Sequence, residues 1–192
     1  TGTFSGGSNP TYSSLGRGSI FFDGANYYQT ITCSDTISHR PNQSFSYEIW
    51  SYFNSFTGYD KILLGKPGCN VGLMEINGTM YMSVVGPNGP CQGGSTSAAA
   101  TAAITAGVWT HWVGTYNVGT GVILYKNGQP VSTASFTGTL GDWGTTLYIG
   151  GDNGLAVYTN RCYVSMVKVY SKALNSLEVL QNYNSTKGRF GL

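Results

Sequence analysis

The stretch that decides the fold runs from Gly107 to Gly128 and reads GVWTHWVGTYNVGTGVILYKNG. Two segments in it, 109–116 and 122–126, alternate so that every second residue falls on one apolar face, as in a β-strand with one buried side. A glycine-rich break separates the two segments, and the second one ends on Asn127-Gly128. An Asn-Gly pair adopts the positive φ angles of a tight hairpin turn. The stretch therefore predicts antiparallel β-sheet.

Similar strand signals recur along most of the chain. Short apolar or alternating runs are separated by turns, and Asn77-Gly78 predicts a hairpin that places Met74 opposite Tyr81. About eleven such runs favour an all-β sandwich. Residues 86–107 are rich in Gly, Pro, Ser and Ala, and we interpret them as a long loop with at most one helical turn at 98–104.

The C-terminal part of the chain differs from the rest. Residues 175–178, Asn-Ser-Leu-Glu, have the form of a capping box, in which the first and last side chains bond each other's backbone N–H groups. They predict a short helix over 176–183. We expect this helix to pack Leu177, Leu180 and Tyr183 against the edge of the sandwich.

Composition limits the classes of function. Charged residues make up 9% of the 192-residue chain, and the net charge is +2 with no cluster of Lys or Arg. Nucleic-acid binding needs grouped cations, so we expect no nucleic-acid partner. No apolar run is long enough to span a bilayer, so we expect no membrane partner. A surface built mainly from uncharged polar residues suits an extracellular protein or one on a virion surface.

The length of the chain suits one domain. Residues 1–17 are polar and rich in Gly and Ser, so we expect an N-terminal arm or linker there. The domain is expected to occupy residues 18–192.

Six segments of the chain, taken in order, carry a family resemblance. The segments are SIFFDG at 19–24, FSYEIW at 45–50, AGVWTHWVGTY at 106–116, LYKNG at 124–128, LYIGG at 147–151 and VKVYSKAL at 167–174. They are similar to successive parts of laminin-G-like domains in the concanavalin A-like lectin/glucanase superfamily. The resemblance implies a concanavalin A-like jelly-roll β-sandwich of two antiparallel sheets with a short C-terminal helix.

A second resemblance is narrower. Residues 173–192, ALNSLEVLQNYNSTKGRFGL, are similar to the ending of laminin-G-like virion proteins of tailed phages, especially marine and cyanobacterial ones. It implies a place on the virion surface, where the partners are other virion proteins or further copies of this chain, such as a homotrimer. The chain departs from the family before its last strand, where Ser165 and Met166 replace an acidic pair.

The four cysteines lack the Cys-x-x-Cys spacing of zinc sites. Cys69 and Cys91 bracket the predicted hairpin at 77–78, which favours a disulfide between them. Cys33 and Cys162 would be sheet neighbours in the laminin-G-like topology, so the resemblance favours a second disulfide there. The alternative is four reduced thiols.

Nothing in the sequence has the pattern of a catalytic site. Glucanases of this superfamily carry two carboxylates close together on one strand. Glu48 is the nearest candidate, but Trp50 stands where the second acid is needed, so we expect Glu48 to bond a neighbouring strand or to face solvent. His111 matches a structural position of the family, and His39 lies in a polar loop. We therefore expect no enzyme activity and no catalytic residues.

Calcium is the one cofactor that the resemblance raises, since many relatives bind it at the rim of the sandwich. Asp23, Asp142 and Asp152 lie in loops and are of the right type for ligands. The same residues suit simple turns, which is the interpretation we favour. We therefore expect no cofactor.

Glycan binding is the functional hypothesis that remains. Sugar sites combine aromatic faces, which stack on the ring, with amide and carboxylate groups that bond hydroxyls. The same residue types also serve in rim packing and subunit contacts. The loop residues of these types are Asn26, Tyr27, Tyr59, Trp143, Asp152, Asn153, Tyr158 and Asn160.

These observations favour a non-catalytic structural or adhesion protein of a virion surface, a capsid decoration or fibre module that binds a cell-surface glycan. One alternative is a secreted or cell-surface carbohydrate-binding module of a cellular organism. The third hypothesis is a glucanase.

Overall fold

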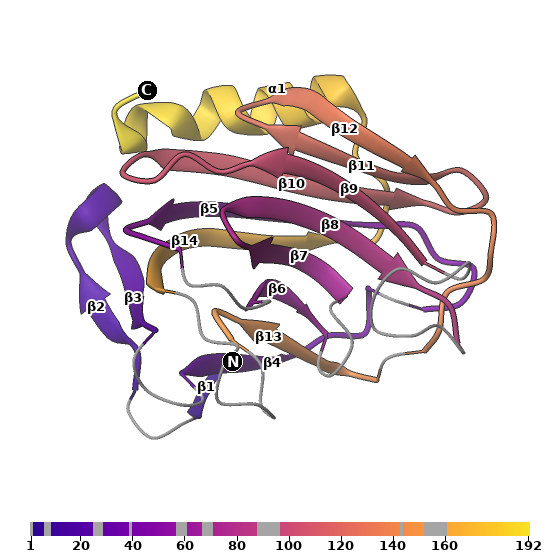
Figure 1. Ribbon diagram of the computed structural model, residues 1–192, viewed down its shortest axis with the longest axis horizontal. Coiled ribbons are helices and arrows are strands. Elements are labelled where there is room, and N and C mark those ends of the chain that lie inside the picture. The colour runs from indigo at the N-terminus through magenta and orange to yellow at the C-terminus, as the bar shows by residue number, and fades with distance from the viewer. Residues whose placement is uncertain are drawn as a thin grey trace.

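The chain folds into a sandwich of two seven-stranded antiparallel sheets, with one helix near the C-terminus (Figure 1). All three features agree with the fold class predicted from the sequence. The computed structural model describes residues 2–5, 9–24, 29–38, 40–56, 61–66, 71–87, 97–142, 144–151 and 161–192.

The first sheet joins strands from the whole length of the chain, so neighbours in space are often distant in sequence. Its order is β1 (Thr3–Ser5), β4 (Thr30–Ser34), β13 (Thr146–Ile149), β6 (Lys61–Lys66), β7 (Val71–Ile76), β8 (Thr79–Val85) and β9 (Ser97–Ala103).

The second sheet contains the stretch that decided the fold. Its order is β12 (Gln129–Ser135), β11 (Gly121–Lys126), β10 (Trp109–Asn117), β5 (Phe45–Phe53), β14 (Arg161–Tyr170), β3 (Ser19–Asp23) and β2 (Thr11–Ser13).

The predicted hairpins are confirmed. In the first sheet, Met74 pairs with Tyr81 across the turn at Asn77-Gly78. In the second sheet, Tyr116 pairs with Val122, which joins the two alternating segments of the decisive stretch. Asn127 and Gly128 have φ angles of 50° and 80°, the positive values that the turn between β11 and β12 requires.

Two sequence interpretations change at the edges of the sheets. The prediction of loop or helical turn at 98–104 is wrong for most of that range, because β9 pairs with β8 along its length and buries Ala98 and Ala100. At the N-terminus, the segment expected to be an arm supplies β1 and β2, the outermost strand of each sheet.

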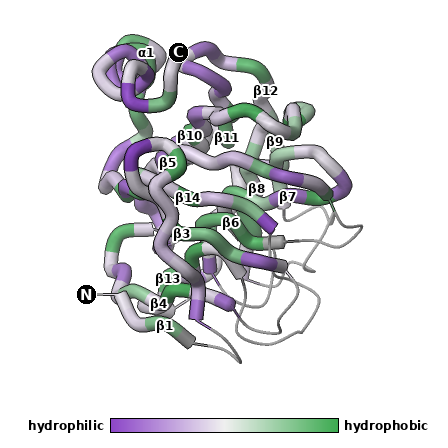
Figure 2. Tube along the Cα trace, turned by 90° about the vertical axis from the view of Figure 1, so that its left-hand side faces the viewer, coloured by the Kyte–Doolittle hydropathy of each residue, from purple (hydrophilic) through white to green (hydrophobic). Residues whose placement is uncertain are grey.

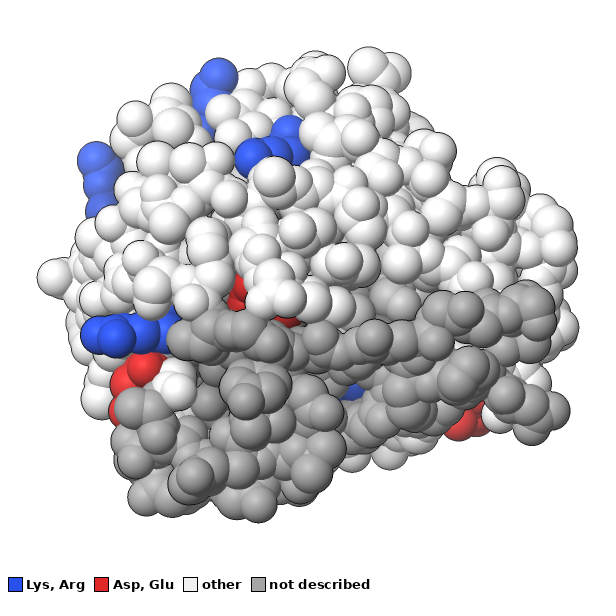
Figure 3. All heavy atoms as spheres, viewed as in Figure 1, with Lys and Arg blue, Asp and Glu red and all other residues white. Residues whose placement is uncertain are grey.

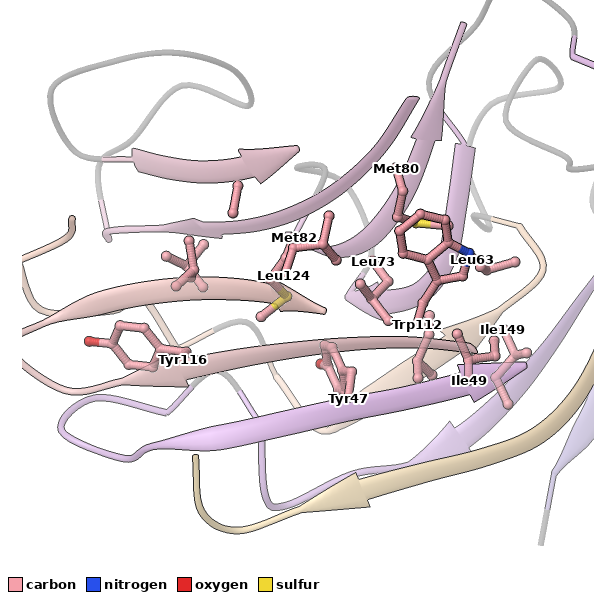
Figure 4. Packing of buried hydrophobic residues seen from close by; sticks show 14 of the residues in the cluster. Tyr47, Ile49, Leu63, Leu73, Met80, Met82, Trp112, Tyr116, Leu124 and Ile149 are labelled. Carbon is pink, nitrogen blue, oxygen red and sulfur yellow. The ribbon is translucent and has the colours of Figure 1, made fainter. Parts of the chain in front are cut away.

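The core lies between the two sheets. Successive residues of a strand point to opposite faces, so Tyr47 and Ile49 of β5 point into the core. Their neighbours Glu48 and Trp50 face the C-terminal segment, and they are buried as well. Figure 4 shows Tyr47 and Trp112 of the second sheet beside Leu73 and Met82 of the first.

The C-terminal segment covers the outer face of the second sheet. Helix α1 (Ser176–Thr186) begins at Asn175, and both bonds of the predicted capping box are present at 3.0 Å. A short 3₁₀ helix, η2 (Lys187–Phe190), follows it. Phe190 stacks on Trp50 with 4.0 Å between ring centroids. Among the described residues, no helix is long and apolar enough to cross a membrane.

The face that α1 buries agrees with the predicted one in part, because Tyr183 stacks on Trp50 as expected whereas Leu177 does not face the sheet. Leu177 is 78% exposed, whereas Val179 is fully buried. The sheet-facing positions include Asn182 and Thr186, which bond Glu48 and Trp50. Because these two positions are polar, hydrophobicity alone assigned the wrong residue to the buried face.

The predicted disulfide between Cys33 and Cys162 is wrong, because they are not sheet neighbours and are not joined. Cys33 pairs with Leu147 in the first sheet, and Cys162 pairs with Phe22 in the second. Both side chains belong to the apolar core. Cys69 and Cys91 lie outside the described residues.

The two sheets approach each other closely at Gly114 in β10. A Cβ atom built there would lie 2.3 Å from the sulfur of Met82 and 3.1 Å from a methyl group of Leu73, both in the opposite sheet. A real Cβ atom cannot occupy that position, so any side chain at residue 114 would push the sheets apart or displace the core.

We therefore predict that Gly114→Ala lowers the free energy of unfolding by about 1–3 kcal/mol through overpacking of the core. The matched control is Gly188→Ala, because no atom lies within 4 Å of a Cβ atom at that position. Urea unfolding measures both variants, and equal stability of the two would contradict the prediction.

Candidate functional site

The eight residues named as glycan ligands all lie outside the described residues. The residues that flank them are described, and they define where each segment leaves the sandwich. The segments concerned are 25–28, 57–60, 143 and 152–160.

Three of these segments are anchored at one end of the sandwich. In the second sheet, Asp23 pairs with Arg161, and Cys162 beside it pairs with Phe53. In the first sheet, the Thr30 hydroxyl donates a hydrogen bond to the carbonyl of Gly151 at 3.2 Å. We call this end the loop rim and define it by the flanking residues Gly24, Gln29, Phe56, Lys61, Gly151 and Arg161.

The residues that flank three of the four segments with predicted ligands therefore lie at the loop rim. The exception is the segment that contains Trp143. Residue 143 is flanked by Asp142 and Gly144, which lie at the opposite end of the sandwich. There the Asp35 N–H donates to the carbonyl of Thr145 at 2.7 Å, and the Lys66 ammonium donates to the carbonyl of Gly144 at 3.2 Å. The sequence could not separate these two locations, because they depend on which strands are neighbours.

A buried ion pair anchors the segment around residue 143. Lys66 Nζ lies 2.7 Å from Asp35 Oδ2, and both side chains are almost fully buried. Burial lowers the pKa of Lys66 from its ordinary value, while Asp35 opposes this shift. Burial raises the pKa of Asp35, but hydrogen bonds from Lys66, Ser38 and the Ile37 N–H hold it below its ordinary value overall. Each group thus favours the charged form of the other.

Glu48 lies on the opposite face of its sheet from the core, beneath α1. Its carboxylate accepts hydrogen bonds from the Lys168 ammonium at 2.9 Å, the Tyr170 hydroxyl at 2.6 Å and the Asn182 amide at 2.7 Å. His111 Nε2 lies 3.3 Å from it. The expectation that Glu48 bonds a neighbouring strand is confirmed, since Lys168 and Tyr170 belong to β14.

These contacts give Glu48 a structural role. The carboxylate is fully buried, and its three hydrogen-bond donors come from the adjacent strand and the covering helix. A carboxylate that acts on a glycosidic bond needs a second one about 5–10 Å away and access to substrate. Across the residues that the structure describes, no group of three or more His, Cys, Asp or Glu side chains is arranged to hold a metal ion.

The buried carboxylate predicts a pH dependence of stability. Burial raises the pKa of Glu48, but the contacts with His111, Tyr170 and Lys168 outweigh this and lower it from 4.5 to about 2. The ionised group therefore stabilises the fold above about pH 4.5, and its contribution is lost as the pH falls toward 2.

We predict that Glu48→Gln lowers the free energy of unfolding at pH 7 by about 2–3 kcal/mol and flattens its dependence on pH between about 5 and 2. Tyr170→Phe removes one donor, so its acid unfolding should begin at higher pH than that of the unmodified protein. Chemical denaturation across this pH range measures both effects. An unchanged acid limb in Glu48→Gln would contradict the account.

A groove with a volume of about 560 Å³ opens at the side of the sandwich where β3 and β14 lie next to β4 and β13. Its floor is aliphatic and comes from both sheets: Ile20 and Val164 from the second, Ile31 and Ile149 from the first. Figure 2 faces this side of the molecule. The volume is typical of pockets that hold small molecules.

The upper wall of the groove is a turn with an uncommon backbone. Gly16, Arg17 and Gly18 have φ angles of 62°, 56° and 111° in succession. Such values cost little for glycine, but they are uncommon for arginine. Met166, which also lines the groove, has a φ of 53° at an irregularity in β14. Strained residues of this kind persist where the surrounding structure holds them, and they cluster at functional sites.

Arg189 of η2 holds this turn. Its guanidinium donates hydrogen bonds to the carbonyls of Gly16, Arg17 and Gly18 at 3.0, 3.0 and 2.9 Å. The Ser165 hydroxyl donates to the Gly18 carbonyl at 2.9 Å. Sequence reasoning identified Ser165 and Met166 as a departure from the family, but it did not connect them with a groove. The Gly-Arg-Gly run at 16–18 was the unused signal.

We predict that Arg189→Ala destabilises the protein by about 1–3 kcal/mol, because three carbonyls lose a charged donor. It should also speed amide hydrogen exchange at Gly18 and Ser19. Arg161→Ala, at an exposed arginine of the loop rim, is the control. Unchanged exchange at Gly18 and Ser19 in Arg189→Ala would show that the turn is held by other contacts.

Comparison with known proteins agrees with this architecture. The family model described as the concanavalin A-like lectin/glucanases superfamily matches residues 22–180. The chain therefore belongs to this superfamily. No curated protein sequence matches it.

Solved structures with the same fold include binding domains of bacterial toxins. The botulinum neurotoxin serotype G binding domain has a TM-score of 0.76 and 12% identity, covering 96% of this chain and 46% of that one. The binding domain of paraclostridial mosquitocidal protein 1 has a TM-score of 0.73 and 14% identity, covering 95% of this chain and 47% of that one. The binding domain of botulinum neurotoxin DC in complex with SialylT has a TM-score of 0.71 and 12% identity, covering 97% of this chain and 46% of that one.

The chain thus spans less than half the length of these toxin binding domains. At such low identity, the likeness establishes the fold alone.

Proposed function

We propose that this chain is a non-catalytic binding module that recognises a cell-surface glycan through the loop rim. The observation that carries the proposal is the anchoring of three ligand-type segments at one end of a lectin-type sandwich. Asn26 and Tyr27 belong to the first segment, Tyr59 to the second, and Asp152, Asn153, Tyr158 and Asn160 to the third. We propose that these residue types act together on one sugar, by stacking and by hydrogen bonds.

The solved structures support binding as the role of this fold. A toxin binding domain of the same architecture was determined in complex with SialylT. In this chain, the described Lys and Arg side chains stand apart on the face drawn in Figure 3. A weakly charged surface favours recognition by hydrogen bonds and stacking over attraction to a polyanion.

The location that we propose is the outer surface of a virus particle, with the domain acting as a capsid decoration or fibre module. The support is the similarity of residues 173–192 to the ending of phage virion proteins. In the structure this segment forms α1 and η2, so it is integrated into the domain. Partners on the particle would be other virion proteins or copies of this chain, such as a homotrimer.

The absence of hydrolytic activity is part of the proposal. Glu48, the nearest match to a glucanase acid, is buried beneath α1 and bonded to Lys168, Tyr170 and Asn182. Its neighbours hold it ionised, whereas a general acid must carry a proton. Release of reducing sugar from β-glucan that disappears in Glu48→Gln would overturn this part.

A secreted carbohydrate-binding module of a cellular organism is the second candidate. It is favoured by the toxin binding domains among the structural neighbours. The two candidates differ in where the protein is found. A virion protein copurifies with infectious particles through density-gradient centrifugation, whereas a secreted module stays in the particle-free medium.

The glycan proposal predicts saturable binding of the purified domain on a glycan array. Tyr27→Ala and Tyr158→Ala should each weaken binding of the best glycan about tenfold or more, since central aromatic contacts dominate recognition. Trp143→Ala is the matched aromatic control, because its flanking residues lie at the other end of the sandwich. It should leave the affinity within about twofold of the unmodified value.

Two results would contradict the proposal. One is an array on which the folded domain binds no glycan. The other is a loss of affinity in Trp143→Ala that equals or exceeds the loss in both tyrosine variants. Isothermal titration calorimetry with the best glycan, together with a thermal melt for each variant, separates loss of binding from loss of fold.

A further inference from the structure

The groove beside β3 and β14 has a chemical character that differs from that of the loop rim. Ile20, Ile31, Ile149 and Val164 form an aliphatic floor at the place where the two sheets part. None of these four side chains offers a hydrogen bond to a sugar hydroxyl. An apolar floor of this kind gains free energy by covering hydrocarbon.

The mouth of the groove carries positive charge. Arg17 and Arg189 both line it, and none of its described lining residues is acidic. Arg189 is committed to the carbonyls of the turn at 16–18. Arg17 is exposed, and no ion pair within the described residues includes it. Its guanidinium is therefore available to an anion.

The backbone presents Arg17 at this position. It occupies the middle of the three-residue run with positive φ that Arg189 fixes. Tyr12, which is 76% exposed, stands on the adjacent wall of the groove. The two side chains meet the solvent at the edge of an aliphatic surface, which is the arrangement that suits a ligand with one apolar end and one charged end.

We propose that this groove binds the aliphatic chain of a free long-chain carboxylate, with the carboxylate group paired to Arg17. The hydrocarbon lies over the isoleucines of both sheets, and Tyr12 covers it from the side. A guanidinium matches a carboxylate because its N–H groups can form two parallel hydrogen bonds. The site is separate from the loop rim and does not depend on glycan binding.

Charge distribution favours a single soluble amphiphile over a membrane surface. Adsorption to an anionic bilayer needs several basic residues grouped near the surface. Among the described residues that line the groove, Arg17 is the one uncommitted cation, and the chain has a net charge of +2 with its Lys and Arg scattered. One cation beside one apolar groove corresponds to one head group and one chain.

The test is calorimetric titration of the full chain with decanoate and dodecanoate below their micelle concentrations. Saturable binding of one molecule per chain is expected, with affinity rising about fourfold for each added methylene group. Arg17→Gln should weaken binding about five- to tenfold. Arg161→Gln, at an exposed arginine outside the groove, should leave it unchanged. Dodecyltrimethylammonium, which reverses the head-group charge, should bind more weakly than dodecanoate.

A second readout locates the ligand without any substitution. In methyl NMR spectra of isoleucine-labelled protein, dodecanoate should shift the signals of Ile20, Ile31 and Ile149. Ile123 of β11, which packs in a separate cluster with Tyr125 and Val179, should not shift.

Several outcomes would overturn the proposal. They are the absence of saturable binding, equal weakening by Arg17→Gln and Arg161→Gln, and methyl shifts confined to other isoleucines. Binding to anionic phosphatidylglycerol vesicles without binding of dodecanoate would assign the groove to a membrane surface. Shifts of the three groove isoleucines on simple concentration of the protein would assign it to a second copy of the chain.

Discussion

The close packing of the two sheets at the centre of the sandwich is the constraint on which the rest of the structure depends. Gly114 leaves room for Met82 and Leu73 of the opposite sheet, and Tyr47 lies beside it on the neighbouring strand. This contact sets the spacing at which side chains from both sheets fill the core. The loop rim and the groove both lie at its boundary, where the sheets end or part.

Polar contacts hold the C-terminal segment on the outer face of the second sheet, outside the core. Glu48 joins β5, β14 and α1 through Lys168, Tyr170 and Asn182. Arg189 then ties the C-terminal segment to the turn at 16–18, which precedes β3. Removing one partner of a buried charge is destabilising, because the remaining groups are left uncompensated. The contacts of Glu48 and Arg189 hold the C-terminal segment against the sheet and the turn.

The parts of the fold that depend on local sequence were predictable. The turns at Asn77-Gly78 and Asn127-Gly128 and the capping box at Asn175 act within a few residues, and each is found where its residues predict it. β9 was not predictable, because alanine has little preference for strands and only pairing with β8 makes this segment extended. On α1, Tyr183 was assigned correctly to the sheet-facing side, but Leu177 was not, since polar Asn182 and Thr186 occupy that side and bond Glu48 and Trp50.

The sequence proposes glycan ligands by residue type, but it does not indicate which of them lie near one another. Residue type alone suggested the glycan ligands, and only strand order separates Trp143 from the segments of the loop rim. The disulfide proposed between Cys33 and Cys162 is not present, and its premise that their strands are sheet neighbours is wrong, because β4 and β14 belong to different sheets. The groove combines residues from β2, β3, β4, β13, β14 and η2, so no single stretch of sequence carries its pattern.

The central claim is that the two sheets unfold as one cooperative unit, and that this unit supports the loop rim and the groove proposed as binding sites. Native-state hydrogen exchange as a function of denaturant tests it most directly, because it reports the free energy of opening for each strand separately. We predict that the amides of β5 and β10 in the second sheet and of β7 and β8 in the first converge on one opening free energy, equal to that of global unfolding. A lower, separate opening free energy for all amides of either sheet would contradict the claim.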